Sequence, residues 1–184
     1  MPGSVFATGE TVELRTIEAE DAAFLAETVN DPRVRAGTAT TTPYSVADER
    51  AWIDGIGDGR DVHLLACVDG DPVGVVGLDH VNETFGSVEV GYQFAPAHWG
   101  EGYATDAVET LCEYAFQQRR FHKVLAYVFE TNPASARVLE KVGFRDEGRH
   151  REEAYVDGEY VDMLAFGLLE GEWRDSDSGY RRDA

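Results

Sequence analysis

The chain alternates between two hydrophobic patterns. Alternating apolar and polar residues, or short apolar runs, predict strands at residues 12–15, 63–68, 73–78, 87–94, 123–129, 144–155 and 160–169. Apolar residues that recur three and four positions apart predict helices at residues 18–30, 45–56, 104–116 and 132–142. Short Gly-containing turns join several of the strands, as in antiparallel hairpins. The predicted order is β-α-α-β-β-β-α-β-α-β-β, which indicates an α/β fold (mixed α+β) with a mostly antiparallel sheet and helices on both faces.

The 184 residues suffice for one domain with a buried core, and we expect that domain to span residues 11–173. Small and turn-forming residues predict a flexible lead-in at 1–10, and polar residues predict a disordered tail at 174–184. Residues 33–43 contain four threonines and no hydrophobic period. They indicate a long loop of the kind that often carries function.

The most informative stretch is residues 99–105, Trp-Gly-Glu-Gly-Tyr-Ala-Thr, which joins a predicted strand to a predicted helix. Its two glycines leave backbone N–H groups pointing outward at the positive end of the helix dipole. Phosphate is the natural ligand of such a turn. Taken alone, the stretch is also compatible with a plain turn.

A second block, Asn132-Pro133-Ala134-Ser135, opens a later helix that closes on Gly143-Phe144. Together the two blocks resemble the GNAT superfamily of acetyl-CoA-dependent N-acetyltransferases, and more narrowly its RimJ/RimL-like branch of ribosomal-protein N-terminal acetyltransferases. That branch typically reads Trp-Gly-x-Gly-Tyr-Ala-Thr and then Asn-x-x-Ser followed by Glu-Lys-x-Gly-Phe. The resemblance extends from about Leu14 to about Trp173. It implies the GNAT fold, in which the strands either side of the phosphate-loop helix splay apart to admit the pantetheine arm.

The resemblance also implies a binding site for acetyl-CoA as co-substrate. Backbone N–H groups of residues 100–104 would hold the pyrophosphate, and the strand edge at Phe94 would meet the pantetheine amides. Glu101 departs from the family pattern, which usually has a basic or neutral residue there, so we expect its side chain to face outward and phosphate binding to weaken at low salt. The expected cofactor-binding residues are Phe94, Trp99, Gly100, Glu101, Gly102, Tyr103, Ala104, Thr105, Asn132 and Ser135.

Acetylation of an amine requires a base, and Glu89 is the candidate. It lies in the strand before the cofactor loop, flanked by Val88 and Val90, so alternation places it on the opposite face from both. The matching glutamate in many GNAT members is implicated as base, often through water. Partial burial that raises its pKa would improve it as a base for an amine. The alternative is a solvent-facing strand glutamate.

The acid that protonates the leaving thiolate is a separate question. Many relatives carry a tyrosine on the last helix, but the corresponding residue here is Leu139. The Rim-like branch places a serine hydroxyl near the sulfur, which makes Ser135 the candidate; an ordinary helix-start hydroxyl, with water as the acid, is the alternative. Asn132 is expected to fix the strand-to-helix turn and touch the cofactor, or simply to cap the helix. Tyr127, on a strand predicted to be buried on both faces, is expected in the core. The expected catalytic residues are Glu89, Ser135 and Asn132.

Charge is the unusual property of the composition. The chain has 35 acidic against 16 basic residues, a formal net charge of −19, and Lys123 and Lys141 are its only lysines. Such a domain repels nucleic acid and anionic membranes, so we expect neither as a partner. The acidity indicates either a halophilic protein adapted to high intracellular salt or a surface that attracts a cationic substrate. A halophilic protein should gain stability between low and molar salt.

The remaining features concern compartment and metals. No stretch approaches the roughly 20 apolar residues of a membrane span, and no N-terminal signal is present, so a cytoplasmic protein is expected. Cys67 and Cys112 are expected to be buried reduced thiols rather than a disulfide or metal pair. The five histidines show no metal-ligand spacing, and no metal is expected.

These observations predict an acetyl-CoA-dependent N-acetyltransferase that transfers acetyl directly to a primary amine. The leading acceptor is the α-amine of a protein N-terminus, because the resemblance points there. A small amine, such as a polyamine, an amino acid or an aminoglycoside, is one alternative, and a non-catalytic acetyl-CoA-binding sensor is another. A monomer or a homodimer is expected. Acceptor recognition is assigned to residues 33–43 and to the last hairpin.

Overall fold

The computed structural model describes residues 2–38, 40–57 and 59–180. The strands are β1 (Val5–Thr8), β2 (Glu13–Arg15), β3 (Val62–Val68), β4 (Asp71–Asn82), β5 (Ser87–Phe94), β6 (Lys123–Phe129), β7 (Arg145–Val156) and β8 (Glu159–Leu169). The helices are α1 (Ala22–Asn30), α2 (Pro32–Thr38), α3 (Val46–Asp54), α4 (Tyr103–Gln117), α5 (Pro133–Val142) and α6 (Glu170–Tyr180). Two 3₁₀ turns, η1 (Ala19–Asp21) and η2 (Pro96–His98), precede α1 and the loop before α4.

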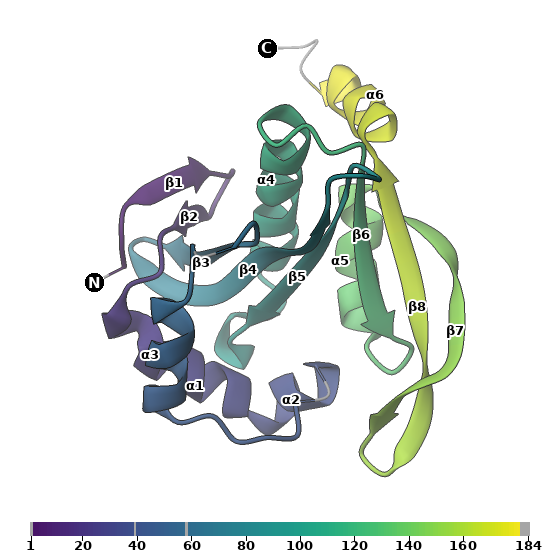
Figure 1. Ribbon diagram of the computed structural model, residues 1–184. Helices are drawn as coiled ribbons and strands as arrows, with labels where there is room; N and C mark the ends of the chain where they lie inside the picture. Colours follow the sequence, from purple (N-terminus) through teal and green to yellow (C-terminus); the bar gives the residue numbers. More distant parts are fainter. Residues whose placement is uncertain (1, 39, 58, 181–184) are drawn as a thin grey trace.

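The strands form one sheet in the order β1-β2-β3-β4-β5-β6-β8-β7 (Figure 1). Among the described strands, β5 and β6 pair in parallel and every other neighbouring pair is antiparallel. The hairpins close through two-residue turns at Asp69-Gly70 and Asp157-Gly158, whose φ angles are all positive, as hairpin turns of this length require. The mixed α/β fold with a mostly antiparallel sheet is therefore confirmed.

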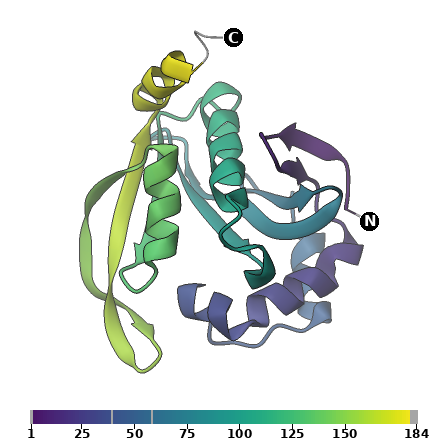
Figure 2. The ribbon, with the colours of Figure 1, turned by 180° about the vertical axis from the view of Figure 1, so that it is seen from behind.

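Helices cover both faces of the sheet, and the strand pleat divides the core accordingly. Successive strand residues face opposite sides, so Leu64 and Leu65 of β3 belong to two separate clusters of buried side chains. Leu64 lies in the larger cluster, between the sheet and helices α4 and α5. Leu65 lies in the smaller one, with Leu25 of α1 and Ile53 of α3. In the view of Figure 2, α4 and α5 lie in front of the sheet.

The N-terminal segment differs from its prediction. The sequence predicts a flexible lead-in at 1–10, but residues 5–8 form β1, antiparallel to β2. Phe6 of β1 packs edge-on against Tyr114 of α4, with ring centroids 5.0 Å apart. Asp106, in the first turn of α4, accepts the backbone N–H groups of residues 10–12 at 2.6–2.8 Å. These contacts join segments about 95 residues apart, so no local pattern could have indicated them.

The predicted loop at 33–43 is partly helical. Helix α2 covers Pro32–Thr38. Pro32 occupies the first helical position, where its missing N–H is no loss. Asp31 accepts the N–H of Arg33 at 2.8 Å and so satisfies one of the free groups at the helix start. Pro32, which stops α1 from continuing, therefore also begins α2. Residues 33–38 contain too few apolar positions for a hydrophobic period to indicate this helix.

The predicted disordered tail at 174–184 is also different where the structure describes it. Helix α6 runs through Glu170–Tyr180, and residues 181–184 lie outside the described residues. Trp173 anchors the helix: its side chain is 8% exposed and its ring lies 5.5 Å from that of Phe116 in α4. Over the described part of the chain, no helix is long and apolar enough to cross a membrane.

Candidate active site

The sheet opens between β5 and β6. Their parallel register runs only from Ser87 to Glu89 of β5, although β5 continues to Phe94 and β6 to Phe129. Beyond that point the facing backbone edges are free to bind something else. A cavity of about 1280 Å³ lies there, lined by both strands, by α1, α2 and α3, by the start of α4, by α5 and by the β7–β8 hairpin. Figure 1 shows the two strands diverging toward the end of the sheet where α2 lies.

The start of α4 borders this cavity and has the geometry of an anion site. Gly100 and Gly102 both adopt left-handed conformations, with φ of 86° and 87°. A Cβ added to either would meet no described atom within 4 Å. No side chain caps α4, and within the described residues no acceptor takes the N–H groups of residues 103–105. A 15-residue helix thus presents free N–H groups at its positive end, which fits a pyrophosphate.

The other residues of the loop take distinct positions. Trp99 donates its indole N–H to the Phe94 carbonyl at 2.7 Å and so ties the loop to the end of β5. Phe94 is itself buried against the α4 side of the sheet. Tyr103, Ala104 and Thr105 line the cavity, as do Trp99 and the two glycines. Glu101 is exposed and is not among the described residues that line the cavity, as expected of a carboxylate next to a phosphate site.

Asn132 and Ser135 lie on the opposite side of the opening, at the start of α5. Asn132 accepts the backbone N–H of Ser135 at 3.2 Å, so it acts as the helix cap. The Ser135 hydroxyl instead lies 2.8 Å from the hydroxyl of Tyr92, a residue that the sequence analysis did not single out. Burial raises the pKa of Tyr92 to about 12, which keeps the phenol protonated. Leu139, at the position of the tyrosine of many relatives, is fully buried.

Glu89 sits where the paired part of β5 and β6 ends. Its side chain is half-buried, lines the cavity and faces the α1–α3 side of the sheet, opposite to Val88 and Val90. Burial raises the pKa of Glu89 above its ordinary value, and the carboxylate of Asp79 adds to the rise while His80 opposes it. The carboxylate is therefore a stronger base than a freely exposed glutamate.

Three residues beside Glu89 were not found by sequence reasoning. Asp79 of β4 is the direct cross-strand neighbour of Glu89. His63 of β3 places its Nε2 2.9 Å from an oxygen of Asp79, and Trp52 of α3 stacks edge-on against the His63 ring at a centroid distance of 5.1 Å. The three side chains line the same cavity. Strand register brings His63 and Asp79 to Glu89, and the packing of α3 on the sheet adds Trp52, and no local motif indicates either arrangement.

Tyr127 corrects one expectation. The apolar run of β6 predicts a strand buried on both faces, but the Tyr127 side chain is 39% exposed and lines the cavity. Its ring contacts that of His150 at 5.8 Å. The reason is the opening itself: where β5 leaves β6, one face of β6 borders open space instead of a packed layer.

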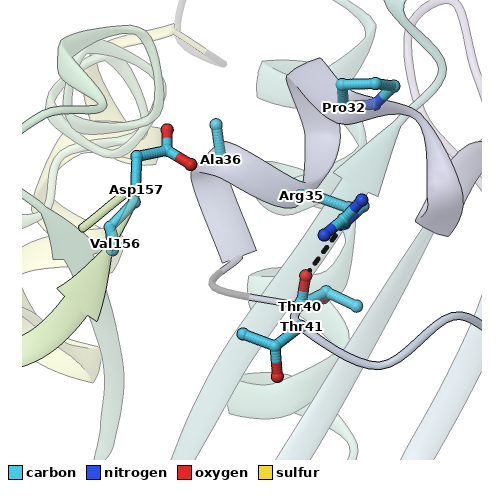
Figure 3. A pocket seen from close by; sticks show the side chains of 7 residues that line it. All are labelled: Pro32, Arg35, Ala36, Thr40, Thr41, Val156 and Asp157. Carbon is cyan, nitrogen blue, oxygen red and sulfur yellow. Dashed lines mark hydrogen bonds between the residues drawn. The ribbon is translucent and has the colours of Figure 1, made fainter.

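A smaller recess of about 160 Å³ lies at the rim, between α2 and the tip of the β7–β8 hairpin. Figure 3 shows Arg35 of α2 with its guanidinium directed at the backbone oxygen of Thr40, a hydrogen bond of 3.0 Å. Asp157 of the hairpin points its carboxylate toward α2. The two segments that the sequence analysis assigned to acceptor recognition therefore meet at one rim.

Cys67 and Cys112 are both buried free thiols, and burial raises the pKa of Cys67 to about 11. Cys67 belongs to the α1–α3 side of the sheet and Cys112 to the α4–α5 side. No group of three or more His, Cys, Asp or Glu side chains among the described residues could hold a metal ion. Among the residues that line the cavity, Glu89, Tyr92, Ser135, Asp79 and His63 carry groups that can exchange a proton.

Comparison with known proteins agrees with this geometry. A family model described as an acetyltransferase (GNAT) domain matches residues 11–145. The chain is 28% identical over 172 residues to the putative ribosomal N-acetyltransferase YdaF of Bacillus subtilis strain 168, covering 89% of this chain and 94% of that protein. It is 28% identical over 170 residues to the uncharacterized N-acetyltransferase p20 of Bacillus licheniformis, covering 89% and 96%.

Solved structures support the same assignment. The spermidine N-acetyltransferase from Vibrio cholerae, in complex with CoA and spermine, superposes with a TM-score of 0.82 at 25% identity. The superposition covers 89% of this chain and 98% of that chain. The family match spans most of the chain and includes the opening, the glycine cradle and Glu89. This protein therefore belongs to the GNAT family of acetyltransferases, and it is an acetyl-CoA-dependent N-acetyltransferase.

Proposed function

We propose that this protein transfers acetyl directly from acetyl-CoA to a primary amine that enters the cavity from the α1–α3 side. The observation that carries the proposal is the place of Glu89. It lies at the last position where β5 pairs with β6, beside the free strand edges and with its pKa raised by burial. Bound acetyl-CoA supplies the acetyl group as a thioester. Everything else is done by residues of this chain.

The two sides of the opening divide the work. The free N–H groups of residues 103–105 bind the pyrophosphate, and the unpaired edge of β5 beyond Glu89 accommodates the pantetheine arm. Glu89 accepts the proton of the incoming ammonium, directly or through water. An amine has an ordinary pKa of roughly 8 to 10, well above that of a free carboxylate. A raised pKa of Glu89 reduces the difference between the two pKa values and so favours proton transfer from the ammonium. The Ser135 hydroxyl, held by Tyr92, is the proton donor on the thiolate side.

The first candidate acceptor is the α-amine of a protein N-terminus. The RimJ/RimL-like motifs support it, and so does the similarity to the putative ribosomal N-acetyltransferase of Bacillus subtilis. In this account the rim formed by α2 and the β7–β8 hairpin receives the first residues of the substrate chain. The cavity is lined by residues from α3 to that rim and has a volume of about 1280 Å³, which leaves room for such a segment.

A small cationic amine is the second candidate, and a specific observation favours it. Acidic side chains line the cavity from three directions: Glu49 from α3, Asp79 and Glu89 from the sheet, and Asp157 from the hairpin. The basic lining residues lie elsewhere, since Arg137 and Lys141 belong to α5 and Arg33 of α2 is paired with Asp31. Such a lining attracts and retains positive charge. The structurally similar Vibrio cholerae enzyme is a spermidine N-acetyltransferase that was solved with spermine.

The test combines binding with turnover in one buffer. Acetyl-CoA is titrated by calorimetry in molar KCl, and thiol release is then followed with N-terminal peptides, polyamines, amino acids and aminoglycosides. Mass spectrometry of the acceptor identifies the acetylated amine. Binding with amine-dependent release and an N-acetylated product is the expected result. Binding of acetyl-CoA without release from any amine in the panel would contradict the proposal and favour a sensor role.

A further inference from the structure

We propose that Glu49 binds a second positive charge of the acceptor, so that the preferred substrate is an amine carrying another ammonium or guanidinium group. The inference rests on the proposed function, because it assigns a specificity residue to the same cavity. It goes further by selecting one acidic residue and by stating what the acceptor must carry besides the amine that receives acetyl.

The burial of Glu49 is the first observation. Only 8% of the residue is exposed, and Asp21 is the other charged residue of the described chain that is buried to this extent. Among the described residues no side-chain oxygen is both closed off from solvent and without a hydrogen-bond partner, so the Glu49 carboxylate still contacts the cavity. With so little exposed surface it is less well hydrated than a surface carboxylate, and a cationic partner would replace the water that it lacks. Burial accordingly raises the pKa of Glu49, and the charge of Asp48 adds to the rise.

The second observation is that Glu49 has no partner of its own. Asp21, the other buried carboxylate of the described chain, accepts a backbone N–H at 2.9 Å in its own turn. By contrast, the Glu49 side chain makes no hydrogen bond and no ion pair with any described residue. Its neighbour Asp48 already occupies the start of α3, where it and Ser45 exchange hydrogen bonds as a capping box. The dipole of α3 favours a negative charge near the helix start, but it gives the Glu49 oxygens no hydrogen-bond donor.

The third observation is where Glu49 lies. It belongs to the cavity lining, one helical turn before Trp52. Trp52 contacts His63, His63 pairs with Asp79, and Asp79 is the cross-strand neighbour of Glu89. Helix α3 and the sheet thus place two carboxylates, Glu49 and Glu89, and the Trp52 ring in one cavity, and neither carboxylate forms an ion pair with a described residue. The ring of Trp52 can bind a cation on its face.

The chemistry of the missing partner follows from these three observations. A little-exposed, unpaired carboxylate in a cavity binds an ammonium or guanidinium group, which supplies both opposite charge and N–H donors. Glu89 is committed to the amine that is acetylated, so Glu49 must serve a different positive group of the same molecule. A diamine fulfils this requirement, and so does a peptide whose N-terminus is followed by a basic side chain.

The experiment measures binding and turnover separately. Calorimetry with 1,4-diaminobutane and with butylamine, which differ by one ammonium, is carried out on the native protein, on Glu49→Gln and on Asp54→Asn. Asp54 is an exposed carboxylate on the same helix and serves as the matched control. The peptides Ala-Arg-Ala and Ala-Gln-Ala form a second matched pair. Acetyl-CoA-dependent thiol release is then measured for the same four compounds.

The native protein should bind the doubly charged member of at least one pair roughly ten-fold more tightly or more, as charged hydrogen bonds allow. Glu49→Gln should abolish that preference and leave binding of the singly charged member within about two-fold, while Asp54→Asn changes neither. A preference within the amine pair identifies a small diamine as the kind of acceptor, and a preference within the peptide pair identifies a basic peptide. Equal binding of both members, or a preference that survives in Glu49→Gln, would overturn the inference even if amines are acetylated. Selective binding without thiol release would support Glu49 and contradict the proposed function instead.

Discussion

The hydroxyl of Tyr92 lies 2.8 Å from that of Ser135, and it also donates to the Ser135 backbone oxygen at 3.1 Å. These bonds connect β5, on one side of the opening, with the start of α5, the helix that follows β6 on the other side. They also settle which residue holds the Ser135 hydroxyl. Asn132 caps α5, so the serine is free to face Tyr92, and its orientation is set across the opening instead of by its own helix.

The pairing predicts that Tyr92→Phe and Ser135→Ala act through the same interaction. Ser135→Ala removes the bond between the two hydroxyls and should lower the free energy of unfolding by about 1 kcal/mol, the usual contribution of one hydrogen bond. Tyr92→Phe also removes the bond to the Ser135 backbone oxygen and should cost about twice as much, and each variant should reduce kcat several-fold. The double variant should be little worse than Tyr92→Phe alone, because Tyr92 takes part in both bonds. Unfolding curves and thiol release are measured for the native protein, the two single variants and the double variant, which together form a double-mutant cycle. Tyr160→Phe, at an exposed tyrosine, is the control. Fully additive effects would show that the two hydroxyls act independently.

The left-handed conformation of Gly102 predicts a binding defect in Gly102→Ala. The φ of 87° costs an alanine about 1 kcal/mol, and relief of that strain would turn the N–H groups at the start of α4 away from the phosphate. The Kd for acetyl-CoA should rise about five-fold or more by calorimetry. Gly171→Ala, in α6 and with ordinary helical backbone, is the control and should leave the Kd unchanged. An unchanged Kd in Gly102→Ala would mean that the loop does not hold the pyrophosphate.

Asp106, which directly follows the 99–105 motif, is predicted to stabilise the fold by holding the N-terminal segment against α4. Its carboxylate accepts three backbone N–H groups from residues 10–12, so Asp106→Ala leaves those donors without their acceptor. The free energy of unfolding should fall by about 2 kcal/mol, whereas exposed Asp61→Ala should change it by less than about 0.5 kcal/mol. Denaturant titration measures both. Equal stability of the two variants would show that water replaces the carboxylate at no cost.

The ionised Glu49 carboxylate is predicted to lower the free energy of unfolding at neutral pH, when no cationic acceptor is bound. Its folded pKa lies above the ordinary 4.5, so the folded state holds the proton more tightly than the unfolded state does. Stability is therefore favoured below about pH 4.5 and is lost as pH rises through the raised folded pKa. Glu49→Gln has no such loss, so it should melt higher than the native protein at pH 7, and the difference should shrink toward pH 4.5. A Glu49→Gln variant that is less stable than the native protein at pH 7 would show that the carboxylate has a partner in the folded chain.

Much of the site could be predicted because it depends on local sequence. The glycines at 100 and 102, the Asn132 cap and the alternation around Glu89 each act within one turn or one strand. The positions of Asp79, His63 and Glu49 could not be predicted in this way, because they depend on strand register and on how α3 packs against the sheet.

The same distinction explains the fold. Strong periodicity predicted α4, β6 and α5 to within a residue or two. Strand β1 and helix α6 are short or polar, and they are held by distant contacts such as Phe6 with Tyr114 and Trp173 with Phe116. Helix α2 depends on a proline that reads equally well as a helix end and a helix start.

Glu89 is proposed as the base of a catalytic site in the opening between β5 and β6. The most direct measurement is kcat of Glu89→Gln with the best amine over about pH 5 to 9, together with the Kd for acetyl-CoA. Exposed Glu83→Gln, in the turn before β5, is the control. The account predicts that Glu89→Gln loses about 10²-fold or more in kcat and that the Kd is unchanged. A Glu89→Gln variant that keeps full kcat across this range would contradict it.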